Sequence, residues 1–309
     1  MKTYSINMNF GDINFYNSSK QSEILGKKIL AEKEKLDFAL TFQNSLIGYK
    51  LKDNQNLTEI YNFPVKVVDF FLANILTNVR QEQFQLMKEM FAALYEHMQK
   101  NPAYYTLRLP ANVADLLQAF NHFAFHPLFC GGTVMYAFHH QDPCRTPDSK
   151  AKAFIADPDY LAQKRSRLLE IIQKSFADYQ SQYHISPVLR NRANQIYENW
   201  IVHSFDNKDE KIIVAEVGGE PVGLHSIGIR TNNIEGVLGA VDPSCRNKGA
   251  YKALISKALT FSRDQGKDFI IGTQLDNYLV QGQWAKFGLT PFFSFYAIHC
   301  DFLNSPGQV

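Results

Sequence analysis

Residues 240–254 read AVDPSCRNKGAYKAL, and this stretch decides the fold of the second half of the chain. A β-strand is expected to end near Val241, a short loop follows with Arg246 and Lys248, and a helix is expected to begin at Gly249. The first turn of a helix carries backbone N–H groups without intrahelical partners and the positive end of the helix dipole. A glycine at this point lets the backbone approach a phosphate closely. We therefore interpret the unit as a cradle for a pyrophosphate group.

This loop differs from two common phosphate-binding loops. A P-loop needs two glycines that flank four residues, followed by Lys and then Ser or Thr, and the loop at 242–249 lacks that arrangement. The Gly-x-Gly-x-x-Gly fingerprint of dinucleotide-binding domains is also absent from the sequence. On these residues alone, a plain strand-to-helix loop with a capping glycine remains the alternative.

The same loop resembles the acetyl-CoA loop of the GNAT acetyltransferase superfamily, in which Arg or Gln is followed by x-x-Gly-x-Gly or x-x-Gly-x-Ala after a strand. Arg246 and Gly249 match this pattern, and Tyr251 stands where Gly or Ala is usual. A second stretch resembles the superfamily's element Asn-x-x-Ala-x-x-x-Tyr-x-Lys-x-Gly-Phe. Its corresponding residues are Asn277, Val280, Trp284, Lys286, Gly288 and Leu289. The resemblance covers residues 160–302, about half of the chain.

The resemblance implies an acetyl-CoA-dependent N-acetyltransferase in which a substrate amine attacks the thioester carbonyl directly. The strands at 235–243 and 268–275 would splay apart to admit the pantetheine arm, and a backbone N–H near Ala240 would polarise the thioester carbonyl. The implied cosubstrate is acetyl-CoA. The residues that the resemblance assigns to its binding are Ala240, Val241, Arg246, Asn247, Lys248, Gly249, Ala250, Tyr251, Asn277 and Trp284.

The proton-transfer roles are where the sequence departs from the superfamily. A phenol at position 284 would protonate the leaving thiolate, whereas the indole of Trp284 is a hydrogen-bond donor without an accessible acid pKa. Tyr278 and Tyr251 are substitutes nearby in the sequence. A base must take the ammonium proton, and Glu235 and His225 are the candidates. The competing interpretations are a solvated strand end for Glu235 and a satisfied, half-buried imidazole for His225.

The length of 309 residues favours two domains. The segment at 141–154 contains two prolines and several charges, so we expect a linker there, between a first domain at 1–140 and a catalytic domain at 155–309. Residues 103–140 and 268–302 share the order strand, short helix, aromatic-rich strand, which indicates a weak internal repeat. The expected fold class is α/β (α+β) with a mixed sheet: a tandem of GNAT-like domains, of which the first is degenerate and lacks the CoA loop.

Hydrophobic periodicity predicts the other main elements. Two long amphipathic helices are expected at 76–100 and 160–183, and a buried strand is expected at 63–70. Residues 211–230 are expected to form a hairpin, because Gly218-Gly219 supplies the positive φ of a tight turn.

The overall charge balance argues against a nucleic-acid-binding protein. Lys plus Arg total 32, Asp plus Glu total 30, and a net charge of +2 predicts no basic face. No window approaches 18 uncharged apolar residues, so we expect no membrane insertion. Four widely spaced cysteines and an N-terminus without a signal-like apolar core favour a cytoplasmic location. The residues His122, His126, Cys130, His139 and His140 lack the paired spacing of zinc sites, so we expect no metal.

The favoured function is transfer of an acetyl group to a primary amine of a small molecule. The stretches IYENW (196–200) and TQLDN (273–277) resemble sugar-nucleotide acetyltransferases such as TDP-fucosamine acetyltransferase, which implies an amino-sugar nucleotide as the acceptor. Two alternatives stay open: a catalytically weak acyl-CoA-binding or sensory module, and an acetyltransferase that modifies a protein amine. A small-molecule amine is the expected partner, and a homodimer is a further alternative.

Overall fold

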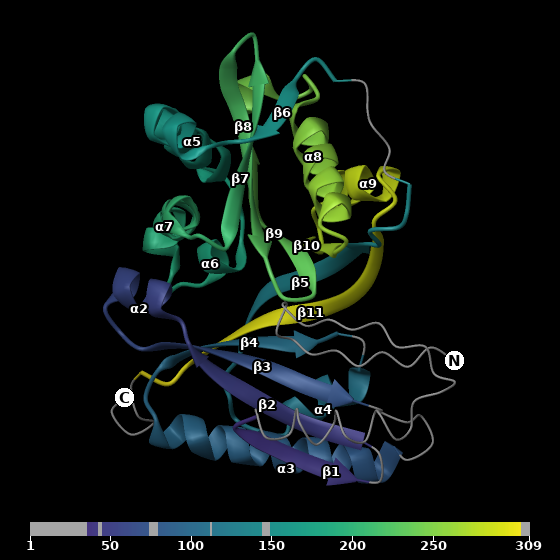
Figure 1. Cartoon of the computed structure of the whole chain (residues 1–309). Helices are drawn as coiled ribbons and strands as arrows, with labels where there is room; N and C mark the ends of the chain where they lie inside the picture. Colours follow the sequence, from purple (N-terminus) through teal and green to yellow (C-terminus); the bar gives the residue numbers. More distant parts are fainter. Residues whose placement is uncertain (1–35, 43–44, 74–79, 112, 144–148, 304–309) are drawn as a thin grey trace. The chain divides into compact units, whose positions relative to one another are not determined.

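The computed structural model describes residues 36–42, 45–73, 80–111, 113–143 and 149–303. The chain divides into two compact units, one formed by Met1–Gly132 with Ser294–Val309 and the other by Thr133–Phe293. Figure 1 shows the helices and strands of both units.

The first unit is built on a mixed sheet. Its strands follow the order β1 (Phe38–Phe42), β2 (Ser45–Asp53), β3 (Val65–Ala73), β4 (Tyr104–Pro110) and β11 (Thr290–Asp301). Strands β3 and β4 run parallel, and the other described neighbours are antiparallel. The helices of this unit are α2 (Gln55–Tyr61), α3 (Arg80–Lys100) and α4 (Ala114–Phe120).

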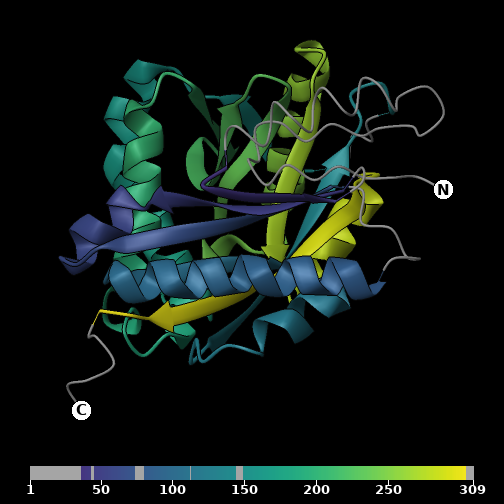
Figure 2. The same cartoon turned by 90° about the horizontal axis from the view of Figure 1, so that it is seen from below.

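Helix α3 forms because its apolar side chains recur at helical spacing. Its buried residues are Met87, Met90, Phe91, Leu94 and Met98. They share one core with sheet residues such as Val68, Leu107 and Ile298, and Figure 2 shows the helix lying along the sheet. The expected helix at 76–100 is therefore confirmed from Arg80 onward, and positions 76–79 lie outside the described residues.

The second unit is a larger mixed sheet with helices on both faces. Its strands follow the order β5 (Leu128–Phe138), β10 (Asp268–Gln274), β9 (Asn233–Val241), β8 (Glu220–Ile229), β7 (Glu210–Val217) and β6 (Lys152–Ile155). Strands β9 and β10 run parallel, and the other described pairs are antiparallel. One face is covered by α8 (Ala250–Asp264) and α9 (Tyr278–Lys286), and the other by α5 (Pro158–Phe176) and α7 (Ala193–Asp206) (Figure 1).

The predicted hairpin at 211–230 is confirmed as β7 and β8, and Gly218 and Gly219 have φ of 65° and 85° in its turn. The predicted helix at 160–183 is shorter than expected, because α5 ends at Phe176 and a separate short helix, α6 (Gln182–Ile185), follows. Ser181 explains the break. Its hydroxyl accepts a hydrogen bond from the Tyr183 N–H at 3.2 Å and so caps the start of a new helix.

Both units repeat one order of elements. A parallel pair of strands is connected by a long helix and followed by a short helix and a final strand: β3–α3–β4–α4–β5 in the first copy and β9–α8–β10–α9–β11 in the second. The final strands are exchanged. Thr133–Phe138 of β5 pair with β10, whereas Phe295–Asp301 of β11 pair with β4. The repeat that the sequence indicated over three elements thus extends over five.

The exchange makes the compact units differ from the expected domains at 1–140 and 155–309. The expected linker at 141–154 also contains part of β6, whose residues Lys152–Ile155 pair with β7. An apolar strand can complete either sheet, because alternation along a strand specifies its buried face and not its neighbour. The mixed α/β fold class is confirmed. The connection between β3 and α3, where the sequence predicts no CoA loop, includes positions 74–79 outside the described residues.

Candidate functional site

The loop before α8 makes a tight turn that only glycine tolerates well. Gly249 is the N-cap of α8 with φ of +84° and no side-chain cap, and a Cβ at this position would lie 2.5 Å from Ser149 Oγ. The Ser149 hydroxyl donates a hydrogen bond to the Gly249 carbonyl at 3.1 Å. Asn247 also has a left-handed backbone, with φ of +64°. Two left-handed residues, Asn247 and Gly249, therefore turn the chain immediately before α8.

Positive charge surrounds this helix terminus. Arg246 and Lys248 are exposed, as is Asn247 between them. Two cations beside the positive end of a helix dipole favour a negatively charged ligand. The expected cradle therefore combines a helix N-terminus with exposed positive charge, and its role in binding phosphate stays a prediction.

Asp242 fixes the loop to the rest of the unit, and sequence reasoning did not single it out. Its buried carboxylate accepts hydrogen bonds from the Ser244 hydroxyl at 2.7 Å and the Ser244 N–H at 2.9 Å, and Arg167 Nη2 of α5 lies 2.6 Å away. The Ser244 hydroxyl and the Arg167 guanidinium lower the pKa of Asp242 to about 2. The Asp-Pro-Ser order after a strand is a turn signal that could have indicated this role.

We expect Asp242→Asn to lower the free energy of unfolding at pH 7 by on the order of 2 kcal/mol. A depressed folded-state pKa gives stability that is present above the unfolded value near 4 and is lost as pH falls toward about 2. Urea denaturation of both proteins at pH 7 and pH 2.5 measures this difference. An undiminished difference at pH 2.5 would contradict the assignment of the effect to the carboxylate charge.

A gap opens between strands β9 and β10 next to this loop. Their parallel pairing ends at Gly236 and Ile271, although β9 continues to Val241 and β10 continues along β5 to Gln274. The register of β8 against β9 also shifts here, so that Val237 has no partner on β8. The splaying that the resemblance implied is therefore present, and it begins at a defined residue pair.

The C-terminal end of α5 and the residues that follow it span this gap on the face opposite α8. The Ser175 hydroxyl donates to the Val241 carbonyl at 3.0 Å, and Gln274 Nε2 donates to the Gln180 carbonyl at 2.8 Å. One segment, residues 175–180, is thus bonded to the diverging ends of both β9 and β10. We call it the bridging segment.

His225 of β8 lies buried on the α8 face of the sheet. Burial lowers its pKa to about 4, and among the described residues neither ring nitrogen has a hydrogen-bond partner. The ring lies over two glycines of β9: a Cβ at Gly236 would be 3.0 Å from Nε2, and one at Gly239 would be 3.5 Å from Cδ2. Unpaired buried polar groups are uncommon in folded proteins, and a ligand is one of the explanations for them.

Tyr251 and Trp284 form a hydrogen-bonded pair next to this histidine. Trp284 Nε1 donates to Tyr251 Oη at 2.9 Å, and the Trp284 ring is 1% exposed and packs edge-on against Tyr136. A Cβ at Gly239 would lie 3.7 Å from the ring of half-buried Tyr251. Burial raises the pKa of Tyr251. In this arrangement Trp284 positions Tyr251 and presents almost no surface of its own.

The remaining candidates lie apart from this group. Glu235 forms an ion pair with Arg230 at 2.8 Å and, by the alternation of β9, faces away from Gly236. Asn277 caps α9, accepting from the Val280 N–H at 3.4 Å and donating to Thr273 Oγ1 at 3.0 Å. Tyr278 is 75% exposed on the first turn of α9, while Ala240 and Ala250 are buried. The structure therefore brings His225, Tyr251 and Trp284 together, and it separates them from Glu235 and Tyr278.

Comparison with known proteins identifies this part of the chain. Residues 168–289 match the model of the acetyltransferase (GNAT) family, a range that includes the gap, the loop before α8 and α9. Residues 168–289 form a GNAT acetyltransferase domain, which makes the chain an acyltransferase. Proteins of this family carry out acyl-CoA-dependent acetyl transfer with acetyl-CoA as cosubstrate. None of the curated proteins compared with the sequence matches it.

Similarity to solved structures extends the GNAT-like fold beyond the matched range. A GCN5-related N-acetyltransferase from Sphaerobacter thermophilus is 12% identical, with a TM-score of 0.53 over 91% of this chain and 86% of that protein. At this identity the likeness concerns the fold alone. A tandem GNAT protein from the clavulanic acid biosynthesis pathway is 11% identical, with a TM-score of 0.49 over 91% of this chain and 96% of that protein. Within the described residues, no helix has the length and apolar character needed to cross a bilayer.

Proposed function

We propose that the protein transfers the acetyl group of acetyl-CoA to a primary amine of a small molecule. The observation that carries this proposal is the gap between β9 and β10, which begins at Gly236 and Ile271 and lies beside the glycine-led terminus of α8. A gap of this kind can admit an extended polar chain, while the helix terminus holds a phosphate group at its end.

The residues present fit the parts of acetyl-CoA. Gly249 has a positive φ at the N-terminus of α8, and Arg246 and Lys248 add exposed positive charge, an environment that favours a pyrophosphate. His225 has two ring nitrogens without described partners: in the neutral ring one N–H can donate to a carbonyl of a polar arm, and the other nitrogen stays available as an acceptor. The binding roles expected for Ala240, Val241 and residues 246–251 remain part of this proposal.

Acetyl-CoA, when bound, supplies an acetyl group on an activated thioester. Tyr251 accepts the Trp284 N–H at Oη, so its own hydroxyl proton is directed elsewhere. Its raised pKa keeps that proton in place at neutral pH, which makes the phenol a hydrogen-bond donor to a leaving thiolate. This geometry favours Tyr251 over Tyr278 for the role that a phenol at position 284 would otherwise have.

His225 and Glu235 remain the proposed bases for the ammonium proton, and they lie on opposite faces of the sheet. His225 is neutral at pH 7 because burial lowers its pKa to about 4, so it can accept a proton or hydrogen bond at one nitrogen. Glu235 forms an ion pair with Arg230, in which Oε2 of the glutamate lies 2.8 Å from Nε of the arginine. A pH profile of kcat for each Gln variant would separate the two candidates.

We expect Tyr251→Phe to lower kcat roughly 10- to 100-fold, because it removes one hydrogen bond to a developing negative charge. Tyr278→Phe is the matched control and should leave kcat unchanged, since that side chain is 75% exposed. Release of free thiol from acetyl-CoA measures both rates, and equal Tm values show that folding is intact. Equal rates for Tyr251→Phe and the wild type would remove Tyr251 from the mechanism.

The bridging segment supports an amine as the acceptor. Tyr179 lies in it, and burial together with the nearby carboxylate of Asp276 raises the pKa of Tyr179 to about 12. An aromatic ring beside a carboxylate is a favourable environment for an ammonium group. Amino-sugar nucleotides are the first acceptors to test, followed by other small primary amines.

Two measurements test the proposed function. Acetyl-CoA should raise Tm, because a ligand that binds the folded state stabilises it, and thiol release should accelerate with at least one member of an amine panel. Binding without turnover on any small amine or peptide would favour the binding-module alternative, which Trp284 at the expected phenol position motivates. Turnover on peptides alone would favour the protein-amine alternative, and the absence of any acyl-CoA-induced shift would exclude the proposal.

A further inference from the structure

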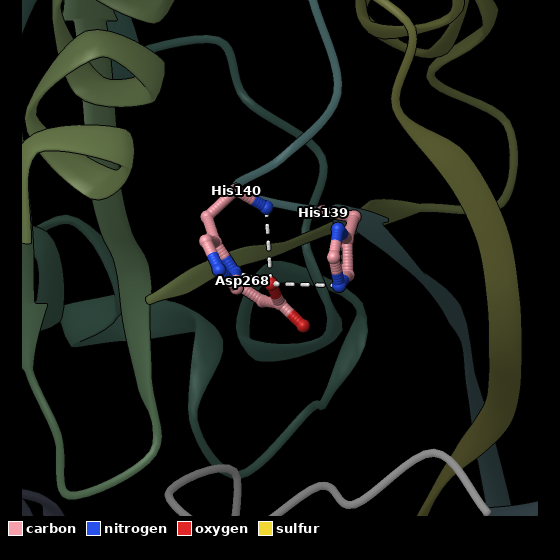
Figure 3. A group of neighbouring side chains, drawn as sticks. All are labelled: His139, His140 and Asp268. Atoms are coloured by element: carbon pink, nitrogen blue, oxygen red, sulfur yellow. Dashed lines mark hydrogen bonds and ion pairs between the residues drawn. The ribbon is translucent and has the colours of Figure 1, made fainter. Parts of the chain in front are cut away.

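Two histidines and an aspartate converge at the edge of the second unit where β10 begins. His139 and His140 directly follow β5, Asp268 is the first residue of β10, and Phe138 pairs with Phe269 in the sheet (Figure 3). His140 Nδ1 lies 2.7 Å from Asp268 Oδ1, and His139 Nε2 lies 3.8 Å from the same oxygen. The cluster lies at the Asp268 end of β10. The gap between β9 and β10 opens toward the other end of the strand, at Gln274.

The donor atoms of this cluster suit a transition-metal ion. One atom from each residue lies within 4.8 Å of the other two. Imidazole nitrogen and carboxylate oxygen are common zinc ligands at about 2.0–2.2 Å, and ligands around such an ion are roughly 3–4 Å apart. Small rotations of the three side chains therefore bring their ligand atoms into coordination, and water can take the fourth position.

The surroundings hold the carboxylate in place and leave access from solvent. The His140 backbone N–H donates to Asp268 Oδ1 at 3.0 Å, which fixes the carboxylate against the end of β5. The side chains are 49% exposed for His139, 28% for His140 and 26% for Asp268. One hydrogen bond competes with metal binding at His139 Nε2: the Gln141 N–H donates to His139 Nδ1 at 3.3 Å, which favours a proton on Nε2. Rotation of the exposed His139 ring breaks this hydrogen bond.

We propose that His139, His140 and Asp268 bind a zinc ion that fastens strand β5 to strand β10. The bonds formed are two Zn–N bonds and one Zn–O bond. When zinc takes the place of the proton at His140 Nδ1, a neutral ring carries its single proton on Nε2, and a doubly protonated ring releases its second proton to solvent. The site is distinct from the acyl-transfer machinery. The effect of the metal is structural. Strand β5 belongs to the first copy of the repeat but pairs with β10 in this sheet, and a metal bound just after β5 adds a cross-link between the two strands. Sequence spacing did not reveal it, since 128 residues separate His140 from Asp268.

The experiment uses the full chain after treatment with a chelator and its removal. Zn²⁺ titrated by calorimetry is expected to bind one equivalent at this site and to raise Tm by at least about 2 °C at saturation. Asp268→Asn keeps the size of the side chain and removes the anionic ligand. Since loss of an outer-shell partner alone weakens metal binding about 10- to 100-fold, loss of a ligand should weaken it at least tenfold.

His139→Ala is the second variant, because this exposed ring can be removed without loss of core packing, and it should weaken Zn²⁺ binding while leaving the metal-free Tm unchanged. His203→Ala is the matched control, because His203 is exposed on α7 and belongs to no such cluster among the described residues. Its affinity for Zn²⁺ should equal that of the wild type. No binding by the wild type, or equal affinity in all four proteins, would overturn the proposal.

Discussion

In the Gly249→Asp variant, we expect acetyl-CoA to lose at least tenfold in affinity and its stabilisation of the fold to disappear at moderate concentrations. The new carboxylate stands at the helix terminus that is proposed to hold the pyrophosphate. Two like charges about 4 Å apart repel by roughly 1–4 kcal/mol, depending on solvent screening, and about 1.4 kcal/mol is a factor of ten. The Cβ would also lie 2.5 Å from Ser149 Oγ, so the Ser149 hydroxyl would have to rotate away and lose its hydrogen bond to the Gly249 carbonyl.

Gly266→Asp is the matched control for this prediction. Gly266 follows the other end of α8 and has φ of +61°, and a Cβ added there would meet nothing within 4 Å. Both variants therefore place the same charged side chain in a left-handed backbone conformation, which lowers stability by about 1 kcal/mol. Titration of acetyl-CoA while Tm is recorded compares them. If both variants lose affinity equally, the loss reflects damage to α8 and the cradle assignment fails.

The conformation of the loop before α8 was predictable because it depends on local backbone chemistry. A strand, a glycine with positive φ and a helix start are all readable from 240–254, and the structure has each of them. The tether between Asp242 and Arg167 was not readable, because the two residues lie 75 positions apart. Hydrogen bonds between distant residues leave no periodic signal, so the sequence indicated a loop and not what holds it.

For the proton-transfer candidates too, the sequence indicated the residues and not the contacts between them. Sequence reasoning named Tyr251 and Trp284 separately and could not predict their hydrogen bond, which joins residues 33 positions apart on α8 and α9. The exposure of Tyr278 and the ion pair of Glu235 with Arg230 also depend on tertiary packing. His225 was named as a base candidate, whereas its lack of described partners could come only from the structure.

The exchange of the final strands predicts which unit loses stability when one of these strands is removed. A chain that ends after Leu289 lacks β11 and should lose the fold of the first unit, although the deletion lies in the second half of the sequence. Ile298, Cys300 and Phe302 belong to the first unit's core. Burying each such side chain contributes about 1.5–3 kcal/mol, so their joint loss approaches the whole stability of a typical domain. A chain that ends after Leu303 keeps these residues and is the control.

Hydrogen exchange locates the damage, because it reports protection element by element. If β11 completes the first sheet, amides of α3 and β4 lose protection in the shortened chain, while those of α8 keep it. If the chain instead formed independent domains at 1–140 and 155–309, the loss of protection would fall on α8 and β10.

Phe138→Ala is the reciprocal test. Phe138 lies in the first half of the sequence but is 1% exposed in the core of the second unit, so its truncation should cost about 3–5 kcal/mol there. Opposite effects from the two changes require exchange, because independent domains would place each loss in its own half of the chain.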